Sequence, residues 1–452
     1  MRFALLFFCL LLSCSRGQAQ PKRVLYVTYS AGYRHDSIPA SIEVMQQIAS
    51  ANGALEVVAS EDLSLISAAG LKDFDALFFF TSGELPIGDS QKQDLLDFVR
   101  SGKGFGGVHS ATDTFYTWPD YGDLIGARFN GHPWVQNVRI DIEDPDHPSV
   151  YDLKPSFSIM DEIYQFRDFS RERDRVLMTL DTKSVDLTTP GVNPGTDDFP
   201  LAWCRNYGSG RVLYVALGHF ESTWRDQRFQ KLLLQSLLWL TGQVAGDATP
   251  RAGVQPNLAP NGIANAASFS PPMAISPGSF ISIYGTGLTS GSTLAADAGT
   301  ASLKLAGTSV RLSGTPVPLL YASAALVNAY VPLDLQGSSF DVGLSVAGGG
   351  TATSTVAGMD ATPGIFTVTT AQNYATVWAT GLGPVDQSGQ FQVTRTQPMV
   401  TVAGAPAQIL FSGLAPGIPG LYLVNVGLPV GLALPALLDF RFGNYESTVR
   451  LK

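Results

Sequence analysis

Histidine is the residue type in this chain best suited to proton transfer or metal binding near neutral pH, because its imidazole titrates there. All five histidines lie in the first 245 of the 452 residues, at His35, His109, His132, His147 and His219. Carboxylates that could act with them stand at Asp113, Asp161 and Glu162. Imidazoles and carboxylates together also bind divalent metals and leave a position open for substrate. Since no pair has a metal-binding spacing such as H-E-x-x-H, the cofactor is left unknown, with a divalent metal as one alternative.

Apolar β-type segments that alternate with helical patterns predict the elements that would position these groups. Strands are predicted at 23–30, 55–60, 76–83 and 104–111, and helices at 37–51, 90–102 and 228–242. Such alternation is typical of parallel βαβ units with right-handed crossovers in a doubly wound α/β sheet. Between His132 and His219 the pattern changes to consecutive strands, which predicts a β-rich, partly antiparallel insertion.

Ligands of a doubly wound sheet bind beyond the carboxyl ends of its parallel strands. Tyr33 and His35 follow the first predicted strand, "GFGGVHSATD" ends a strand at His109, and His219 ends the last strand. The topology should therefore gather these side chains at one rim. We predict His109 and His219 as the catalytic residues, acting either as acid and base or as metal ligands. The predicted substrate-binding residues are Tyr33, His35, Ser110, Asp113, His132 and Glu162.

Structural roles compete with several of these assignments. His147 in "DPDHPSV" is typical of a turn residue that hydrogen-bonds its own loop, and His132 in "NGHP" could equally shape the entry into the next strand. Asp161 and Glu162 would point to opposite faces of a strand, so only Glu162 is predicted to face the pocket. Ser110 would need a nearby base to act as a nucleophile, and a helix N-cap is an equal alternative.

The region from about Lys22 to Gly242 resembles the ThuA (trehalose utilisation) family in several motifs. These are "GYRHDSI", "GFGGVHSATDTFY", "LIGARFNGHP", "DHPSV", "DEIYQF" and "PLAWCRNYGSGRVLYVALGH". The resemblance implies a flavodoxin-like fold similar to that of the class I glutamine amidotransferases. Those enzymes carry a cysteine nucleophile at the elbow where this chain has His109, so cysteine-dependent amide hydrolysis is not expected. The resemblance also implies a role in the catabolism of disaccharides or their keto derivatives.

The second half of the chain has a different character. Residues 246–452 carry 15 of the 67 charged residues, and their strand-like segments lie between Gly, Pro and Ser turns. An internal repeat aligns "VRLSGTPVPLLY" with "VTVAGAPAQILF" and "VNAYVP" with "VNVGLP". This pattern predicts tandem Ig-like β-sandwiches at 262–366 and 367–452, after a linker at 243–261. The repeats resemble the β-sandwich module at the C-terminus of many large secreted bacterial proteins.

The first residues predict export. An apolar run from Phe3 to Leu12 follows Arg2 and is too short to span a bilayer, which is typical of a signal peptide at 1–19. Cleavage before Gln20 and a lipid anchor at Cys14 are equal alternatives. The predicted location is therefore periplasmic, secreted or on the outer surface. Cys204 is the one cysteine outside the leader and is predicted to be a buried core residue.

Three hypotheses for the function follow. The first is an exported sugar-processing protein that uses histidine-based acid–base or metal-assisted chemistry on a small carbohydrate. The second is a carbohydrate-binding protein without catalysis, and the third is adhesion, with surface association through the repeats or a lipid anchor. The net charge of −9 argues against a nucleic-acid partner, and no second long apolar span predicts a membrane segment. Whether the protein is an enzyme is left uncertain at this point.

Overall fold

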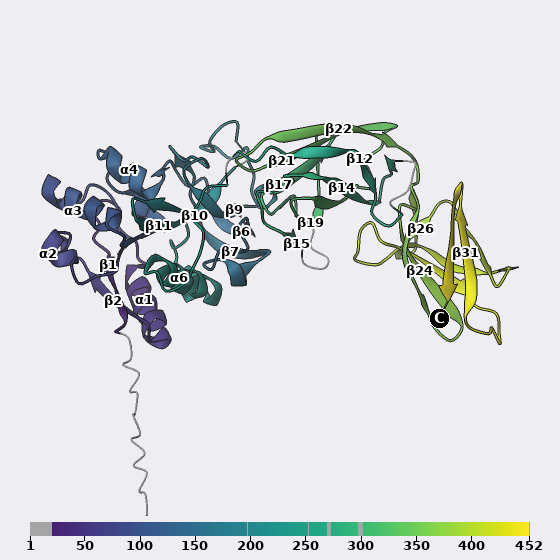
Figure 1. The fold of residues 1–452 in the computed structure, drawn as a ribbon, viewed down its shortest axis with the longest axis horizontal. Coiled ribbons are helices and arrows are strands. Elements are labelled where there is room, and N and C mark those ends of the chain that lie inside the picture. Colours follow the sequence, from purple (N-terminus) through teal and green to yellow (C-terminus); the bar gives the residue numbers. More distant parts are fainter. Residues whose placement is uncertain (1–19, 197, 252, 269–272, 297–301, 452) are drawn as a thin grey trace, which may run out of the picture.

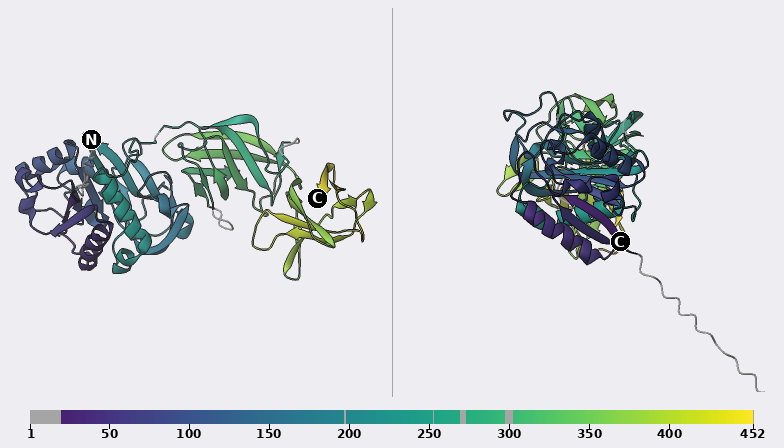
Figure 2. Two further views of the ribbon diagram at one scale, coloured as in Figure 1. Left: turned by 60° about the horizontal axis from the view of Figure 1, so that its bottom comes forward. Right: turned by 90° about the vertical axis from the view of Figure 1, so that its left-hand side faces the viewer.

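The computed structural model describes residues 20–451, apart from 197, 252, 269–272 and 297–301. The predicted signal peptide and Cys14 lie outside the described residues. Three bodies follow one another in a row, an α/β domain and two β-sandwiches (Figure 1). The left view of Figure 2 shows the same succession from another side. Over the residues described, none of the helices combines the length and the apolar character needed to cross a membrane.

The α/β domain is built on a nine-stranded sheet. Its strands are β1 (Lys22–Val27), β2 (Leu55–Ser60), β3 (Ala76–Phe79), β4 (Gly104–Val108), β6 (Trp134–Ile142), β7 (Ser156–Ile163), β9 (Arg175–Leu180), β10 (Pro200–Tyr207) and β11 (Gly210–Val215). Their order across the sheet is β2-β1-β3-β4-β11-β10-β9-β6-β7. A separate two-stranded ribbon is made of β5 (Arg128–Phe129) and β8 (Phe166–Arg167).

The sheet has a parallel half and an antiparallel half. Strands β2, β1, β3, β4 and β11 pair in parallel, whereas β10, β9, β6 and β7 continue the sheet with antiparallel pairing. Every residue of β3 and β4 is buried, because helices cover both faces of the parallel half. The predicted doubly wound sheet with a β-rich insertion is confirmed.

Helices lie on both sides of this sheet. They are α1 (Ile38–Asn52), α2 (Ala68–Leu71), α3 (Asp89–Arg100), α4 (Pro119–Ile125), α5 (Glu221–Arg225) and α6 (Gln227–Leu240). Figure 1 shows α1 and α6 on one side of the sheet and α3 and α4 on the other. The glycines of β4 allow close packing at its centre, since a Cβ at Gly106 would lie 2.2 Å from the Phe78 ring.

The two sandwiches repeat one arrangement of strands. The first contains β12 (Asn257–Asn265), β13 (Ala274–Ile275), β14 (Phe280–Thr286), β15 (Leu294–Ala295), β16 (Lys304–Leu305), β17 (Thr308–Leu312), β18 (Thr315–Val317), β19 (Leu319–Ala322), β20 (Leu326–Tyr330), β21 (Ser339–Val346) and β22 (Thr351–Gly358). The second contains β23 (Gly364–Thr370), β24 (Tyr374–Thr380), β25 (Val385–Ser388), β26 (Phe391–Thr394), β27 (Met399–Val402), β28 (Ala405–Pro406), β29 (Ile409–Leu414), β30 (Tyr422–Gly427), β31 (Ala436–Phe442) and β32 (Tyr445–Leu451). The run β12-β14-β20-β19 in one sheet corresponds to β23-β24-β30-β29 in the other, as the internal repeat predicted. Each sandwich has its own apolar core.

The strand positions shift two of the predicted limits. Strand β12 begins at Asn257, inside the predicted linker 243–261, and β23 crosses the predicted boundary between residues 366 and 367. The first part of the linker also packs on the α/β domain: Ala248 is buried in its core, and the Arg251 guanidinium lies 2.9 Å from the buried Asp144 carboxylate. Composition alone did not reveal this packing.

Charged and polar groups join the α/β domain to the first sandwich. Lys304 lies 3.9 Å from Glu143 and 3.6 Å from Asp198, while Ser302 donates a hydrogen bond of 3.2 Å to Asp141. Burial raises the pKa of Asp141 to about 7, and the nearby Asp181 carboxylate acts in the same direction. Between the two sandwiches, the Phe280 amide donates to Thr380 Oγ1 at 2.8 Å. Both junctions therefore contain directed polar contacts.

Candidate functional site

His109 stands where β4 ends, as the sequence predicted. A 3₁₀ helix (His109–Asp113) begins directly after Val108, and His109 has a left-handed backbone with φ of 46°. Such a backbone costs a non-glycine residue roughly 1–3 kcal/mol. The conformation is held by Tyr214, whose hydroxyl donates a 2.6 Å hydrogen bond to the His109 carbonyl. The imidazole is fully buried, and its Nδ1 lies 2.9 Å from the carbonyl oxygen of Ala216.

His219 follows β11 on a loop that a buried carboxylate fixes in place. Asp161 accepts hydrogen bonds from the backbone N–H of Gly218 at 2.7 Å and of His219 at 3.1 Å. Gly218 has a φ of 131°, a conformation that side chains rarely adopt, and it lets the loop pass close to Val108. The His219 ring lies beside that of His109, with 5.4 Å between the ring centroids.

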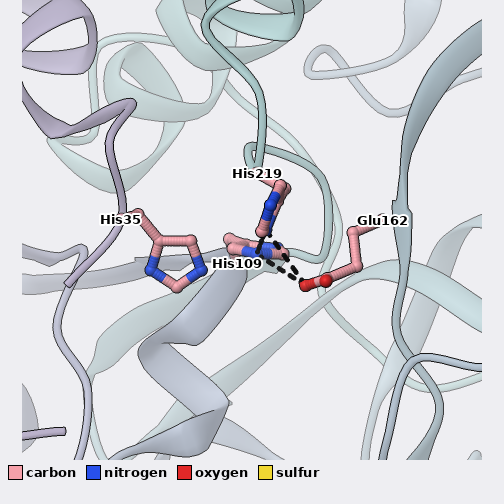
Figure 3. A group of neighbouring side chains, drawn as sticks. All are labelled: His35, His109, Glu162 and His219. Atoms are coloured by element: carbon pink, nitrogen blue, oxygen red, sulfur yellow. Dashed lines mark hydrogen bonds and ion pairs between the residues drawn. The ribbon is translucent and has the colours of Figure 1, made fainter. Parts of the chain in front are cut away.

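The carboxylate of Glu162, near the end of β7, joins the two imidazoles (Figure 3). Glu162 Oε2 lies 3.4 Å from His109 Nε2 and 3.1 Å from His219 Nδ1, and the two ring nitrogens are 3.3 Å apart. The other carboxylate oxygen, Oε1, lies 3.3 Å from Nδ1 of the half-exposed His132. Side chains from three strand ends thus meet at a single point.

His35 completes this group from the loop after β1. Its ring centroid lies 4.7 Å from that of His109 and 5.2 Å from that of His219. Each of the four residues His35, His109, Glu162 and His219 offers a metal-ligand atom within 4.8 Å of the others. We call these four residues the histidine cluster.

The charges of the histidine cluster are distributed unevenly. Burial raises the pKa of the Glu162 carboxyl, but the hydrogen bonds from His109 and His219 outweigh this effect and hold the pKa well below its usual range. The hydrogen bond to Glu162 raises the pKa of His219. Burial, followed by the charges of His109 and His219, lowers the pKa of His35 to about 3. Glu162 is therefore ionised at neutral pH, and His35 is a neutral imidazole.

Comparison with protein families matches residues 23–240 to the family ThuA, described as trehalose utilisation. This region of the chain is a ThuA-family domain. The family resemblance carried by the sequence motifs is thereby confirmed. A comparison with curated proteins found no significant match.

Solved structures similar to the ThuA domain include two proteins described as putative ThuA-like proteins. The protein from Bacteroides uniformis is 21% identical, covers 49% of this chain and 93% of its own, and has a TM-score of 0.42. The protein from Parabacteroides merdae is 20% identical, covers 50% of this chain and 92% of its own, and has a TM-score of 0.41.

The remaining predicted site residues of the ThuA domain lie around the histidine cluster at different depths. Tyr33 is 61% exposed and contacts the His35 ring edge-on, with 4.8 Å between the ring centroids. The carboxylate of Asp113 accepts a 2.5 Å hydrogen bond from the Tyr116 hydroxyl. Ser110 is buried, and its hydroxyl contacts neither a base nor a helix end among the described residues. His132 reaches the cluster through its ion pair with Glu162, at 3.3 Å.

Two other residues of the ThuA domain were not predicted as parts of the site. Asp161 was set aside because it points away from Glu162 along the strand, yet its carboxylate binds the loop of His219 through the backbone. Tyr164 lies against His109, with 4.2 Å between the ring centroids. Since Tyr164 comes two residues after Glu162, the two-residue period of a strand could have placed it on the same face.

His147 lies apart from the cluster, as its structural alternative predicted. Its Nδ1 accepts a 3.3 Å hydrogen bond from the Ser149 amide of its own turn, and its Nε2 lies 3.7 Å from Cys204 Sγ. Cys204 is fully buried in mid-strand, in agreement with the predicted core role.

Proposed function

We propose that this chain is an exported carbohydrate-processing protein that acts on a disaccharide or a keto derivative of one. One observation carries the proposal: imidazoles from three distant parts of the ThuA domain and the carboxylate of Glu162 converge beyond the carboxyl ends of the parallel strands. The family's description as trehalose utilisation supports the sugar as the substrate class.

His219 is the member of the histidine cluster best placed to contact a substrate. Its side chain is 21% exposed, whereas that of His109 is completely buried beneath it. His219 would contact the reacting oxygen of the sugar, and His109 would hold the His219–Glu162 pair from below. The exposed Tyr33 and His132 lie at the entrance, where they would contact the sugar ring. On this basis we propose His219 as the catalytic residue and His109 as the residue that positions it.

The test is product formation from trehalose, sucrose and their keto derivatives by the full-length protein. We expect His219→Ala and His109→Ala to abolish turnover, and His219→Ala to change the melting temperature little because its side chain is partly exposed. The control is His147→Asn, whose side-chain oxygen can still accept the Ser149 amide and which lies outside the cluster. Turnover retained in His219→Ala would refute the assignment.

Isothermal calorimetry with the same sugars separates catalysis from binding. Binding without product would support the carbohydrate-binding alternative. A protein that neither binds nor converts these sugars would refute the proposed substrate class.

Export is the remaining part of the proposal, and the apolar run of the first residues supports it. Mass spectrometry of the protein recovered from its native host tests this point. An N-terminus at Gln20 indicates ordinary signal-peptide cleavage, and a lipid-modified Cys14 indicates an anchored protein. An intact N-terminus in the cytoplasmic fraction would contradict export.

A further inference from the structure

Three atoms of the histidine cluster form a triangle whose dimensions fit the coordination of a small divalent cation. Its sides are the 3.3 Å between His109 Nε2 and His219 Nδ1, and the 3.4 and 3.1 Å from these nitrogens to Glu162 Oε2. Bonds of about 2.0–2.1 Å at tetrahedral angles separate two ligand atoms by about 3.3–3.4 Å. The three side chains therefore already hold the spacing of three tetrahedral ligands.

The hydrogen bonds of His109 fix which of its nitrogens faces this triangle. A carbonyl oxygen only accepts, so the 2.9 Å contact with Ala216 O requires the proton on His109 Nδ1. A cation that displaces the Nε2 proton would bind the lone pair left there, at the position from which His109 now donates to Glu162 Oε2. A histidine ligand usually donates its second N–H to a carbonyl or carboxylate in this way, which fixes the ring orientation and tautomer.

The partners of Glu162 also leave room for a positive ion. In the described part of the chain, the ion pairs of its carboxylate are all with histidines: His109, His132 and His219. A cation in the triangle would balance the charge of this carboxylate.

His35 provides a further donor next to the triangle. It is 4% exposed, and its Nδ1 is a buried atom without a hydrogen-bond partner in the residues described. Figure 3 shows its ring facing the other three side chains, and its ligand atom lies within 4.8 Å of theirs. Three imidazoles with one carboxylate suit first-row transition metals, whereas Ca²⁺ and Mg²⁺ prefer sets made of oxygen ligands.

We infer that His109, His219 and Glu162 bind one divalent transition-metal cation of the zinc type, with His35 as a fourth ligand on the side of the loop after β1. The inference rests on the proposed function only for what the cation does: when bound, it would polarise an oxygen of the sugar as a Lewis acid. His132 holds the second oxygen of Glu162 and so orients the carboxylate toward the buried side. Tyr164 packs on the His109 ring and keeps that ring in place.

The experiment measures metal binding by the full-length protein without any sugar. The protein is stripped with a chelator and titrated with Zn²⁺ and Co²⁺ by calorimetry, and the metal retained after dialysis is counted by elemental analysis. We expect one equivalent per chain, and visible absorption of the Co²⁺ form typical of low coordination number. Glu162→Gln and His219→Gln should each weaken binding by at least about tenfold, since even the outer partners of ligands contribute that much.

His147→Asn is the matched control. His147 lies outside the cluster, and the asparagine oxygen can still accept the Ser149 amide. We expect this variant to keep one equivalent of metal. Circular dichroism of each variant verifies that it is folded, and the stoichiometry of the unmutated protein does not depend on any variant.

The results separate this inference from the proposed function. No retained metal in the unmutated protein, or metal lost from His147→Asn but kept in Glu162→Gln, would overturn the cation site. Sugar turnover that needs His219 but continues in stripped protein would overturn the Lewis-acid role of the cation and leave the proposed function standing. One equivalent of metal bound at the cluster of a protein that converts none of these sugars would support the cation site and contradict the proposed function.

Discussion

Replacing Asp161 by asparagine tests how the loop of His219 is held. In Asp161, Oδ1 accepts the amides of Glu162 at 2.9 Å and His219 at 3.1 Å, and Oδ2 accepts the amide of Gly218 at 2.7 Å. An asparagine whose oxygen takes the place of Oδ1 keeps two of these bonds. Its NH₂ group then faces the Gly218 N–H, so two donors oppose each other at a fully buried position.

The expected loss of stability follows from these contacts. A hydrogen bond to a charged group contributes about 1.5–3 kcal/mol, and a buried donor left without a partner costs about 1–3 kcal/mol. Because burial raises the pKa of Asp161, the neutral amide avoids part of the cost of burying a charge. We therefore expect Asp161→Asn to reduce the free energy of unfolding by about 3 kcal/mol, toward the low end of the sum.

Urea unfolding followed by tryptophan fluorescence is the suitable assay, since five of the six tryptophans lie in the ThuA domain. Asp113→Asn is the matched control, because its side-chain oxygen can still accept the Tyr116 hydroxyl, and it should cost less than about 1 kcal/mol. Asp161→Asn should also weaken metal binding at the cluster by displacing His219. A loss of stability under about 1 kcal/mol in Asp161→Asn would refute this account of the loop.

Three further changes have expected outcomes. The pKa of Asp141 lies near 7 in the folded protein against an ordinary 3.8, so the folded state binds a proton more tightly and stability falls as pH rises from about 4 to about 7. Asp141→Asn should remove up to about 4 kcal/mol of that dependence, and melting curves whose pH dependence is unchanged in the variant would contradict it. Gly218→Ala should lower the melting temperature, at a cost of about 1–3 kcal/mol from its backbone, and unchanged calorimetric stability would refute the strain. A chain ending at Gly242 should melt below one ending at Gly253, which keeps Arg251 on the ThuA domain, and equal melting temperatures would contradict that packing.

The positions of the strand ends in the sequence were enough to predict which residues form the site. His109, His219, His35 and Glu162 come together because each follows, or nearly ends, a strand whose last residue lies at the same edge of the sheet. That argument needs only the alternation of elements and the residue types after each strand. The argument does not predict how deeply each side chain is buried. Tyr33 lies at the surface, whereas His109 is buried beneath the cluster.

Strand ends and residue types could not predict contacts with backbone groups or contacts between domains. The period of β7 places Asp161 and Glu162 on opposite sides, but the loop of His219 curves round to meet the Asp161 carboxylate. The pairing of Lys304 with Glu143 joins residues more than 150 positions apart. No local pattern of charge or hydropathy indicates such a partner, because the contact exists only once both domains have folded.

The row of three bodies has a mechanical consequence. Charged pairs join the ThuA domain to the first sandwich, and the Phe280–Thr380 hydrogen bond joins that sandwich to the second. Directed contacts at both joints favour one relative orientation of neighbouring domains over the others. The distance between the histidine cluster and the second sandwich is then set by the architecture of the chain.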